Sequence, residues 1–386
     1  MSARAIDATN SGLSAPKLEQ MRQWLAAEVE AGRLPGAVVA LWRFGQPAYH
    51  CAVGWQDAVA RVPMRTDALF RIYSMTKPIT SVAALMLVDA GRLALADEVV
   101  AWLPAFGHRG VTVLDLLMHT AGLVYGPRHA DPALRQAYAQ QGVGINPRGL
   151  TAQALVQGLS RVPLSHPPGQ CWEYGNASDL LGVLVEAVSG QRLGAFLQAQ
   201  VFAPLGMVDT AFVVPADQAH RVAQPLPRDP EDGTPLQQPD QSFDALQPPL
   251  LDSGGAGLIS TAADYGRFAN GLLAGGAPLL QRPTLDAMVR DHLAPRHVLA
   301  QPTPGEAALQ SPGYGFGHGV AVRLPGTAAS LPHSPGTFLW SGTAGTLFWV
   351  DPVQQLVAVY LTQAPGASRQ RYRRLITQWV YRALEV

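Results

Sequence analysis

A lysine that follows a serine by three residues is the first candidate for chemistry in this sequence. The chain has 28 lysines and arginines together, and only Lys17 and Lys77 are lysines. An amine can lose its proton near neutral pH, whereas a guanidinium stays charged. The stretch Ser74-Met75-Thr76-Lys77 has the spacing of a serine nucleophile paired with a lysine base. We therefore expect Ser74 to attack a substrate and Lys77 to take its proton.

A second serine has the same spacing, but its surroundings predict a different role. Ser14 lies three residues before Lys17 and directly before a polar and apolar pattern typical of a surface helix over residues 17–32. It is therefore expected to be the N-cap of that helix. Ser74 instead precedes a strongly apolar segment, residues 79–90, whose apolar positions recur at helical spacing. The sequence predicts a buried helix with Ser74 at its N-terminal mouth.

The mouth of a helix favours the chemistry expected of Ser74. Backbone N–H groups and the helix dipole stabilise negative charge there, which helps both an alkoxide and an oxyanion. Lys77 lies one turn later on the same face as Ser74. Burial lowers the pKa of a lysine, so the Lys77 amine could be neutral enough to accept a proton. The competing interpretation is a capping serine beside a surface lysine.

A tyrosine and an asparagine just before another predicted helix are candidates for the next steps of the reaction. Tyr174 and Asn176 precede a helical pattern over residues 177–188. A tyrosine beside a protonated lysine has its phenolate stabilised and can pass a proton to a leaving group. The Asn176 amide can bind a substrate carbonyl or the lysine itself. Alternatively, Tyr174 is a packing residue and Asn176 a helix cap.

These motifs together resemble the serine β-lactamase and penicillin-recognising superfamily, particularly class C β-lactamases and family VIII carboxylesterases. The resemblance spans nearly the whole chain in the order of the family. Its motifs are Ser-Met-Thr-Lys-Pro at 74–78, Leu-Leu-Met-His-Thr-Ala-Gly-Leu at 116–123, Tyr-Gly-Asn at 174–176, Phe-Ala-Pro-Leu-Gly-Met-Val-Asp-Thr at 202–210, and Ser-Gly-Gly-Ala-Gly-Leu-Ile-Ser-Thr at 253–261.

One family motif differs in this chain. Class C β-lactamases carry Lys-Thr-Gly on the strand beside the site, whereas the corresponding stretch here is Trp340-Ser341-Gly342, followed by Thr343. This stretch is similar to that of family VIII esterases. The resemblance implies that these residues contact the substrate and that the backbone N–H groups of Thr343 and Ser74 form the oxyanion hole. A cation at the first position would hold the carboxylate of a β-lactam, and tryptophan cannot. Alternatively, Trp340 is an ordinary core aromatic of a strand.

The remaining pattern predicts an α+β fold, in which an antiparallel β-sheet flanked by helices is built from both chain ends. Short β-rich runs separated by tight turns favour antiparallel pairing. They are expected at residues 36–44, 47–53, 317–323, 337–340, 345–350 and 356–362, with a closing helix over 369–384. We expect residues 1–73 and 255–386 to form this sheet lobe. Residues 74–254 would form an inserted, mainly helical lobe, with the active site in the cleft between the two. Proline-rich segments at 222–250 and 301–316 are expected to be surface loops.

Composition excludes several classes of partner. The formal net charge is zero and no run of basic residues occurs, so nucleic acid and anionic membrane surfaces are not expected as partners. Cys51 and Cys171 are not spaced as a metal or redox pair and are expected to be buried free thiols. The first ten residues have no apolar core of a signal peptide, and no apolar run reaches membrane-spanning length, so we expect a cytoplasmic protein without a membrane segment.

Other residues with chemical potential do not form a recognisable site. The ten histidines lack metal-ligand spacing, and a dinucleotide fingerprint is absent, so no metal or cofactor is expected. His119 is expected to be a satisfied structural histidine. His318 and His333 flank the third motif and could line the cleft, without an assigned role. Because the chain contains no Gly-x-Ser-x-Gly, a nucleophile of the α/β-hydrolase type is not expected.

The sequence therefore predicts an acyl-serine hydrolase that acts on small-molecule carboxylic esters with short to medium acyl chains. Ser74 would form the acyl-enzyme, and Lys77 and Tyr174 would take and return the proton. The alternatives on the same site are a β-lactamase or D-amino-acid peptidase, and an acyltransferase. A non-catalytic binding homologue is the remaining alternative, but it would not need all three residues.

Overall fold

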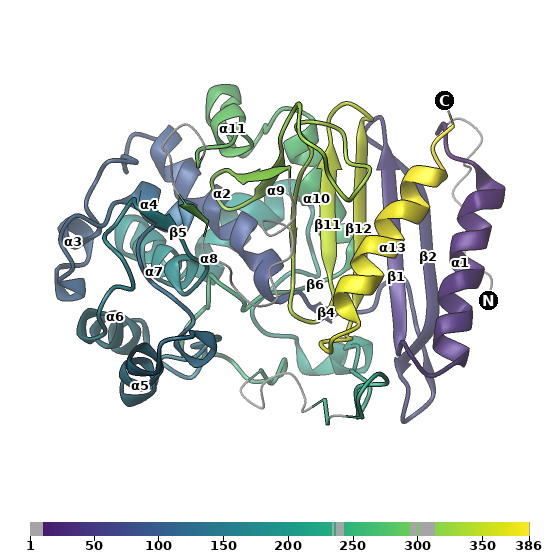
Figure 1. The fold of residues 1–386 in the computed structure, drawn as a ribbon, viewed down its shortest axis with the longest axis horizontal. Coiled ribbons are helices and arrows are strands. Elements are labelled where there is room, and N and C mark those ends of the chain that lie inside the picture. The colour runs from purple at the N-terminus through teal and green to yellow at the C-terminus, as the bar shows by residue number, and fades with distance from the viewer. Residues whose placement is uncertain (1–10, 234, 237–242, 294–298, 301–312, 386) are drawn as a thin grey trace.

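An eight-stranded antiparallel sheet, built from both ends of the chain, is the centre of the fold (Figure 1). The structure is a computed structural model and describes residues 11–233, 235–236, 243–293, 299–300 and 313–385. The strand order is β3-β2-β1-β12-β11-β10-β9-β8. The strands are β1 (Gly36–Arg43), β2 (Gln46–Asp57), β3 (Val62–Pro63), β8 (Tyr314–Phe316), β9 (Ala321–Arg323), β10 (Phe338–Ser341), β11 (Leu347–Asp351) and β12 (Leu356–Thr362).

The pairing of β1 with β12 joins the two ends of the chain. Ala37 pairs with Thr362 and Arg43 with Leu356, and the two strands are antiparallel throughout. Both strands are buried almost along their whole length, because helices cover both faces of the sheet. Helices α1 (Ala15–Glu30) and α13 (Arg369–Arg382) lie on one face, and α10 (Ala262–Leu273) packs on the other against β1, β11 and β12. The predicted fold class is confirmed.

Helices dominate the segment between β4 and β6. They are α2 (Thr76–Asp89), α3 (Val99–Trp102), α4 (Val113–Met118), α5 (Pro132–Gln140), α6 (Ala152–Arg161), α7 (Ala177–Ser189), α8 (Leu193–Leu197) and α9 (Ala203–Leu205), and α11 (Arg282–Met288) follows α10. Short 3-10 turns lie at Pro104–Phe106, Gly126–Arg128 and Ala216–Arg221, and a π-helical turn at Gln198–Phe202. Helices α2 and α7 pack against each other at the centre of this region. The proposed lobe boundaries stay a prediction.

Two small sheets, which the sequence pattern did not indicate, hold the helical region in place. β4 (Phe70–Arg71) pairs antiparallel with β6 (Ile259–Ser260). β5 (Cys171–Trp172) pairs parallel with β7 (Leu299–Ala300). Each has only two residues per strand, too short for a period-2 pattern to be recognisable.

Two local expectations need correction, and a third is confirmed in part. The strand expected over residues 317–323 is a turn followed by β9, because Gly319 adopts φ 85° and the Gly317 N–H donates to the Val320 carbonyl. Cys51 is buried, but Cys171 is half-buried, because Trp172 takes the inward-facing position of β5. Ser14 has the N-cap position of α1, yet its side chain makes no capping hydrogen bond.

Parts of the two predicted loops, namely 234, 237–242 and 301–312, lie outside the described residues. Among the described residues, no single helix is long and apolar enough to cross a membrane. The pair Ala177–Ser189 and Leu193–Leu205 meets the length and composition criteria only together, with a bend of 75° between its members.

Candidate active site

Ser74 lies in a sharp turn between a strand and a helix. The 3-10 turn η2 (Tyr73–Met75) follows β4 almost directly and leads into α2. Tyr73 has φ 46°, a left-handed conformation that is rare for an aromatic residue and costs on the order of 1–3 kcal/mol. This turn places Ser74 at the N-terminal mouth of α2, as predicted, with a side chain that is 5% exposed.

Lys77 lies in the first turn of α2 and is almost completely buried, at 1% exposure. Its amine is within hydrogen-bond distance of three oxygens. They are Ser74 Oγ at 3.4 Å, Tyr125 Oη at 2.9 Å and the Gly255 carbonyl at 2.7 Å. The structure therefore brings the predicted nucleophile and the predicted base together.

The three oxygens around the Lys77 amine differ in what they can do. A charged ammonium has three donors and no acceptor, whereas a neutral amine has two donors and one lone pair. The Gly255 carbonyl can only accept, so one N–H must stay on it. The Ser74 and Tyr125 hydroxyls can either accept from the ammonium or donate to the lone pair of the neutral amine. This arrangement can take a proton from Ser74 and can exchange one with Tyr125.

Tyr174 follows β5 and precedes α7, and its ring covers the Lys77 amine. The Lys77 nitrogen lies 4.5 Å from the centre of the Tyr174 ring, a cation–π distance. The Tyr174 hydroxyl accepts a hydrogen bond of 3.2 Å from Trp340 Nε1. Tyr174 is thus beside Lys77, as predicted, but its described hydroxyl contact is with Trp340. Both rings are 2% exposed, so the site has a low local dielectric.

Further aromatic rings enclose Tyr174. The ring centres of Tyr125, Trp340 and His119 lie 5.4, 5.3 and 4.7 Å from that of Tyr174. Burial lowers the pKa of His119 well below its usual value, and the nearby Lys77 charge lowers it further. His119 Nε2 lies 3.4 Å from Ser178 Oγ, while Nδ1 has no hydrogen-bond partner in the described part of the chain. His119 is therefore a neutral packing residue, and only one of its ring nitrogens is satisfied.

Two groups at the site were not among the predicted residues. Tyr125 lies in the loop after α4, and no spacing rule connects it to Ser74. The only sequence feature that could have indicated it is its position just after the Leu-rich motif at 116–123. Gly255 belongs to the motif at 253–261, but a backbone carbonyl has no signature in a sequence. Both reach Lys77 through packing between distant segments.

A buried carboxylate lies behind Gly255. Asp179 in α7 is fully buried and accepts hydrogen bonds from Ser253 Oγ at 2.5 Å and from the Gly255 N–H at 3.1 Å. Burial raises the pKa of the Asp179 carboxyl, and the Lys77 charge and these donors act against that rise. Gly255 thus donates to Asp179 and accepts from Lys77, so that the carboxylate holds the segment that positions the amine.

The predicted oxyanion donors lie on two segments in contact. A tight turn joins β10 to β11, in which the Gly345 N–H donates to the Gly342 carbonyl. Thr343 is the first central residue of this turn, a position whose N–H the turn does not use. Thr346 Oγ1 donates to the Ile72 carbonyl at 3.4 Å, and a side chain at Gly342 would collide with the same carbonyl. The turn therefore packs against the chain two residues before Ser74.

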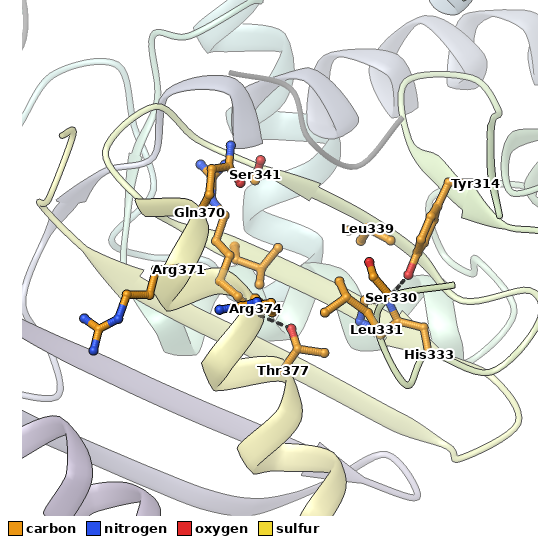
Figure 2. Close-up of a pocket in the computed structure, with 12 residues that line it drawn as sticks. Tyr314, Ser330, Leu331, His333, Leu339, Ser341, Gln370, Arg371, Arg374 and Thr377 are labelled. Atoms are coloured by element: carbon orange, nitrogen blue, oxygen red, sulfur yellow. Dashed lines mark hydrogen bonds between the residues drawn. The ribbon is translucent and has the colours of Figure 1, made fainter. Parts of the chain in front are cut away.

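Four other predicted residues have contacts of their own. Asn176 is fully buried, and its amide donates to the Gly144 carbonyl and to Asp179, so its substrate-binding role stays a prediction. Ser341 lines a cavity behind β10 (Figure 2). Side chains of a strand alternate between its faces, so Trp340 points to the opposite side. His333 lines that same cavity, and His318 stacks on His292 with ring centres 4.4 Å apart. The described residues contain no group of three or more His, Cys, Asp or Glu that could hold a metal ion.

The chain is similar to known proteins over most of its length. The model of the family described as Beta-lactamase matches residues 21–379. Esterase EstB of Burkholderia gladioli is 34% identical over 384 residues, which cover 94% of this chain and 94% of EstB. Protein Rv1367c of Mycobacterium tuberculosis is 35% identical over 358 residues, which cover 86% and 87% of the two chains. Among solved structures, "EstCE1, a hydrolase with promiscuous acyltransferase activity" superposes with a TM-score of 0.79 at 28% identity, covering 95% of this chain and 99% of that one.

Proposed function

This chain belongs to the beta-lactamase family, and from that premise we propose that it cleaves carboxylic esters of short to medium acyl chains through an acyl-Ser74 intermediate. One observation carries the proposal: the buried Lys77 amine contacts Ser74 Oγ and the Tyr125 hydroxyl at once. A serine with a positioned base can form an acyl-enzyme, and a second hydroxyl on the same base can return the proton.

In acylation, Ser74 Oγ attacks the ester carbonyl while its proton moves to Lys77. The oxyanion of the tetrahedral intermediate is held by the backbone N–H groups of Ser74 and Thr343. The intermediate collapses as the alcohol leaves with a proton that Lys77 supplies through a tyrosine hydroxyl, either that of Tyr174 or that of Tyr125. Water then attacks the acyl-enzyme by the reverse path and releases the acid.

Trp340 favours esters over β-lactams. By resemblance it corresponds to the position where class C β-lactamases carry a lysine, and its N–H donates to the Tyr174 hydroxyl. Losing a charge-assisted hydrogen bond to the lactam carboxylate costs about 1.5–3 kcal/mol, or roughly 10- to 150-fold in rate. A simple ester has no such carboxylate and loses nothing, while the indole adds apolar surface beside the acyl chain.

The test compares p-nitrophenyl butyrate with the chromogenic cephalosporin nitrocefin. We expect efficient cleavage of the ester and a value of kcat/KM for nitrocefin that is lower by about 10- to 150-fold. Ser74→Ala should abolish ester cleavage, whereas Ser14→Ala, which changes the other serine with the same spacing, should leave it unchanged. Comparable kcat/KM on the two substrates would overturn the ester assignment.

Acyl transfer to an alcohol is the second candidate, because the acyl-enzyme does not dictate its acceptor. The similar EstCE1 is described as a hydrolase with promiscuous acyltransferase activity, which supports this candidate. Adding a primary alcohol to the butyrate assay should then produce the butyryl ester of that alcohol, detectable by gas chromatography. Formation of butyric acid alone at all alcohol concentrations would leave hydrolysis as the reaction.

A further inference from the structure

A cavity of about 390 Å³ lies between helix α13, strand β10 and the segment before β10 (Figure 2). We call it the α13 cavity. Side chains of a strand alternate between its two faces, so Trp340 points to Tyr174 while Leu339 and Ser341 point into this cavity. The α13 cavity and the candidate active site are therefore on opposite faces of one strand.

The walls of the cavity are mostly apolar, and its polar groups are cationic or neutral. Leu331, Leu339 and Leu347 provide apolar surface, while Arg373 and Arg374 of α13 provide positive charge. None of the described residues that line the cavity is acidic. Arg371 also borders it, but its guanidinium points away and pairs with Glu28 at 2.8 Å. This chemistry fits a ligand with an apolar body and one negative charge.

One lining side chain is buried without a complete set of hydrogen bonds. His333 is 4% exposed, and its Nδ1 lies 2.7 Å from the Tyr314 hydroxyl. Its Nε2 has no hydrogen-bond partner within the described residues. Burial lowers the pKa of His333 to about 3, so the ring is neutral at pH 7. When the Tyr314 hydroxyl donates to Nδ1, the ring proton is on Nε2, which is buried in the wall of the cavity.

Besides Arg373, the cavity has a second cation, Arg374. Arg374 is exposed, and none of the ion pairs described in the structure includes it. Because an arginine can hold a carboxylate with two parallel hydrogen bonds, Arg374 is suited to fix the charged end of a ligand. The aliphatic chain of that ligand would then lie along the three leucines.

Arg373 connects the cavity to the candidate oxyanion hole. Its guanidinium donates a hydrogen bond to the Gly342 carbonyl, at the start of the turn that carries the Thr343 N–H. A carboxylate in the cavity competes for this guanidinium, because a charged acceptor binds it more strongly than a neutral carbonyl does. Drawing Arg373 away would loosen the turn and reduce the preorganisation of the Thr343 donor.

We propose that the α13 cavity binds a medium-chain aliphatic carboxylate, and that the bound carboxylate slows acyl transfer at Ser74 through Arg373 and Gly342. The binding of the carboxylate depends only on the cavity, whereas the kinetic effect rests on the proposed esterase function. The acid products of ester hydrolysis belong to this chemical class, so the site would respond to product.

Calorimetric titration of the full chain with sodium octanoate tests the binding step. The Ser74→Ala variant is used as well, so that the result does not depend on turnover. We expect one octanoate per chain, with octan-1-ol binding at least about tenfold more weakly because it lacks the charge. Arg374→Gln should weaken octanoate binding by about tenfold or more, whereas Arg382→Gln, a change at an exposed arginine on the same helix, should not. Equal affinity for octanoate and octan-1-ol, or equal affinity in parent and Arg374→Gln, would refute the site.

Steady-state kinetics on p-nitrophenyl butyrate test the coupling. Octanoate should lower kcat by about twofold to tenfold without raising KM, and Arg374→Gln should require more octanoate for the same effect. An increase in KM with unchanged kcat would place octanoate in the active site and overturn the coupling. If the protein does not cleave the ester at all, the proposed function fails, while the calorimetric result still decides whether the cavity binds carboxylates.

Discussion

The Tyr125 hydroxyl lies 2.9 Å from the Lys77 amine, closer than the Ser74 hydroxyl at 3.4 Å. The base of the candidate site is therefore held between two hydroxyls, and the nearer one belongs to a loop residue 48 positions away in the sequence. This contact suggests that Tyr125 shares with Tyr174 the task of passing protons between Lys77 and the leaving group.

Tyr125→Phe tests this role directly. The variant keeps the ring that packs against Tyr174 and removes only the hydroxyl on Lys77. We expect kcat on p-nitrophenyl butyrate to fall by about 10- to 100-fold with little change in KM, because a positioned proton-transfer group is lost. Tyr49→Phe, which removes a long hydrogen bond to the Leu18 carbonyl far from the site, is the matched control. Equal kcat in the parent and Tyr125→Phe would show that the hydroxyl only fills space.

Lys77→Arg separates the charge of Lys77 from its ability to accept a proton. An arginine keeps the positive charge but supplies no neutral amine, so kcat/KM should drop by at least about 100-fold. Lys17→Arg is the natural control, because Lys17 is the only other lysine and lies exposed on α1. Circular dichroism checks that both variants fold. Activity within a few-fold of the parent would mean that Lys77 is only structural.

Trp340→Phe removes the hydrogen bond from the indole to the Tyr174 hydroxyl and keeps an aromatic ring in the strand. If this bond orients Tyr174 for proton transfer, kcat should fall by about tenfold, the worth of roughly 1.4 kcal/mol. Trp349→Phe is the comparison, because Trp349 is equally buried and its Nε1 has no hydrogen-bond partner among the described residues. A similar loss of kcat in both variants would attribute the effect to packing and not to the hydrogen bond.

Glu28 couples the stability of the sheet region to pH. Hydrogen bonds from Arg33, Arg371 and Tyr372 lower the pKa of the Glu28 carboxyl from 4.5 to about 2, although burial opposes this. The carboxyl thus contributes stability that is fully present above pH 4.5 and is lost as the pH falls towards 2. Glu28→Gln should lower the free energy of unfolding at pH 7 by about 1–2 kcal/mol and weaken its fall between pH 4.5 and 2.

Urea denaturation at several pH values measures this effect. Glu19→Gln, at an exposed ion pair with Arg22 on the same helix, should change the free energy of unfolding very little. Parallel acid profiles for the parent and Glu28→Gln would contradict the assignment.

The sequence alone determined the local parts of the site. Ser74 and Lys77 are three residues apart, so the turn η2 running directly into α2 brings them together. Helix α7 ends at Gly190, where a glycine readily adopts the left-handed φ of 75°. The full length of β12 follows from an apolar run of only a few residues. A sheet assembled from both chain ends followed from the β-rich runs there, whereas the pairing of β1 with β12 did not.

Only the tertiary structure decided which distant groups meet Lys77 and Tyr174. Tyr125, Gly255 and Trp340 reach them across 48, 178 and 166 positions of sequence, and no local pattern encodes such contacts. His333 illustrates the same limit, because its nearness to the third motif in sequence did not reveal that it lies behind β10 and not in front of it. Side chains along a strand alternate between the two faces of the sheet. Because α13 packs against one of these faces, its packing determines which residues share a site and which the sheet separates.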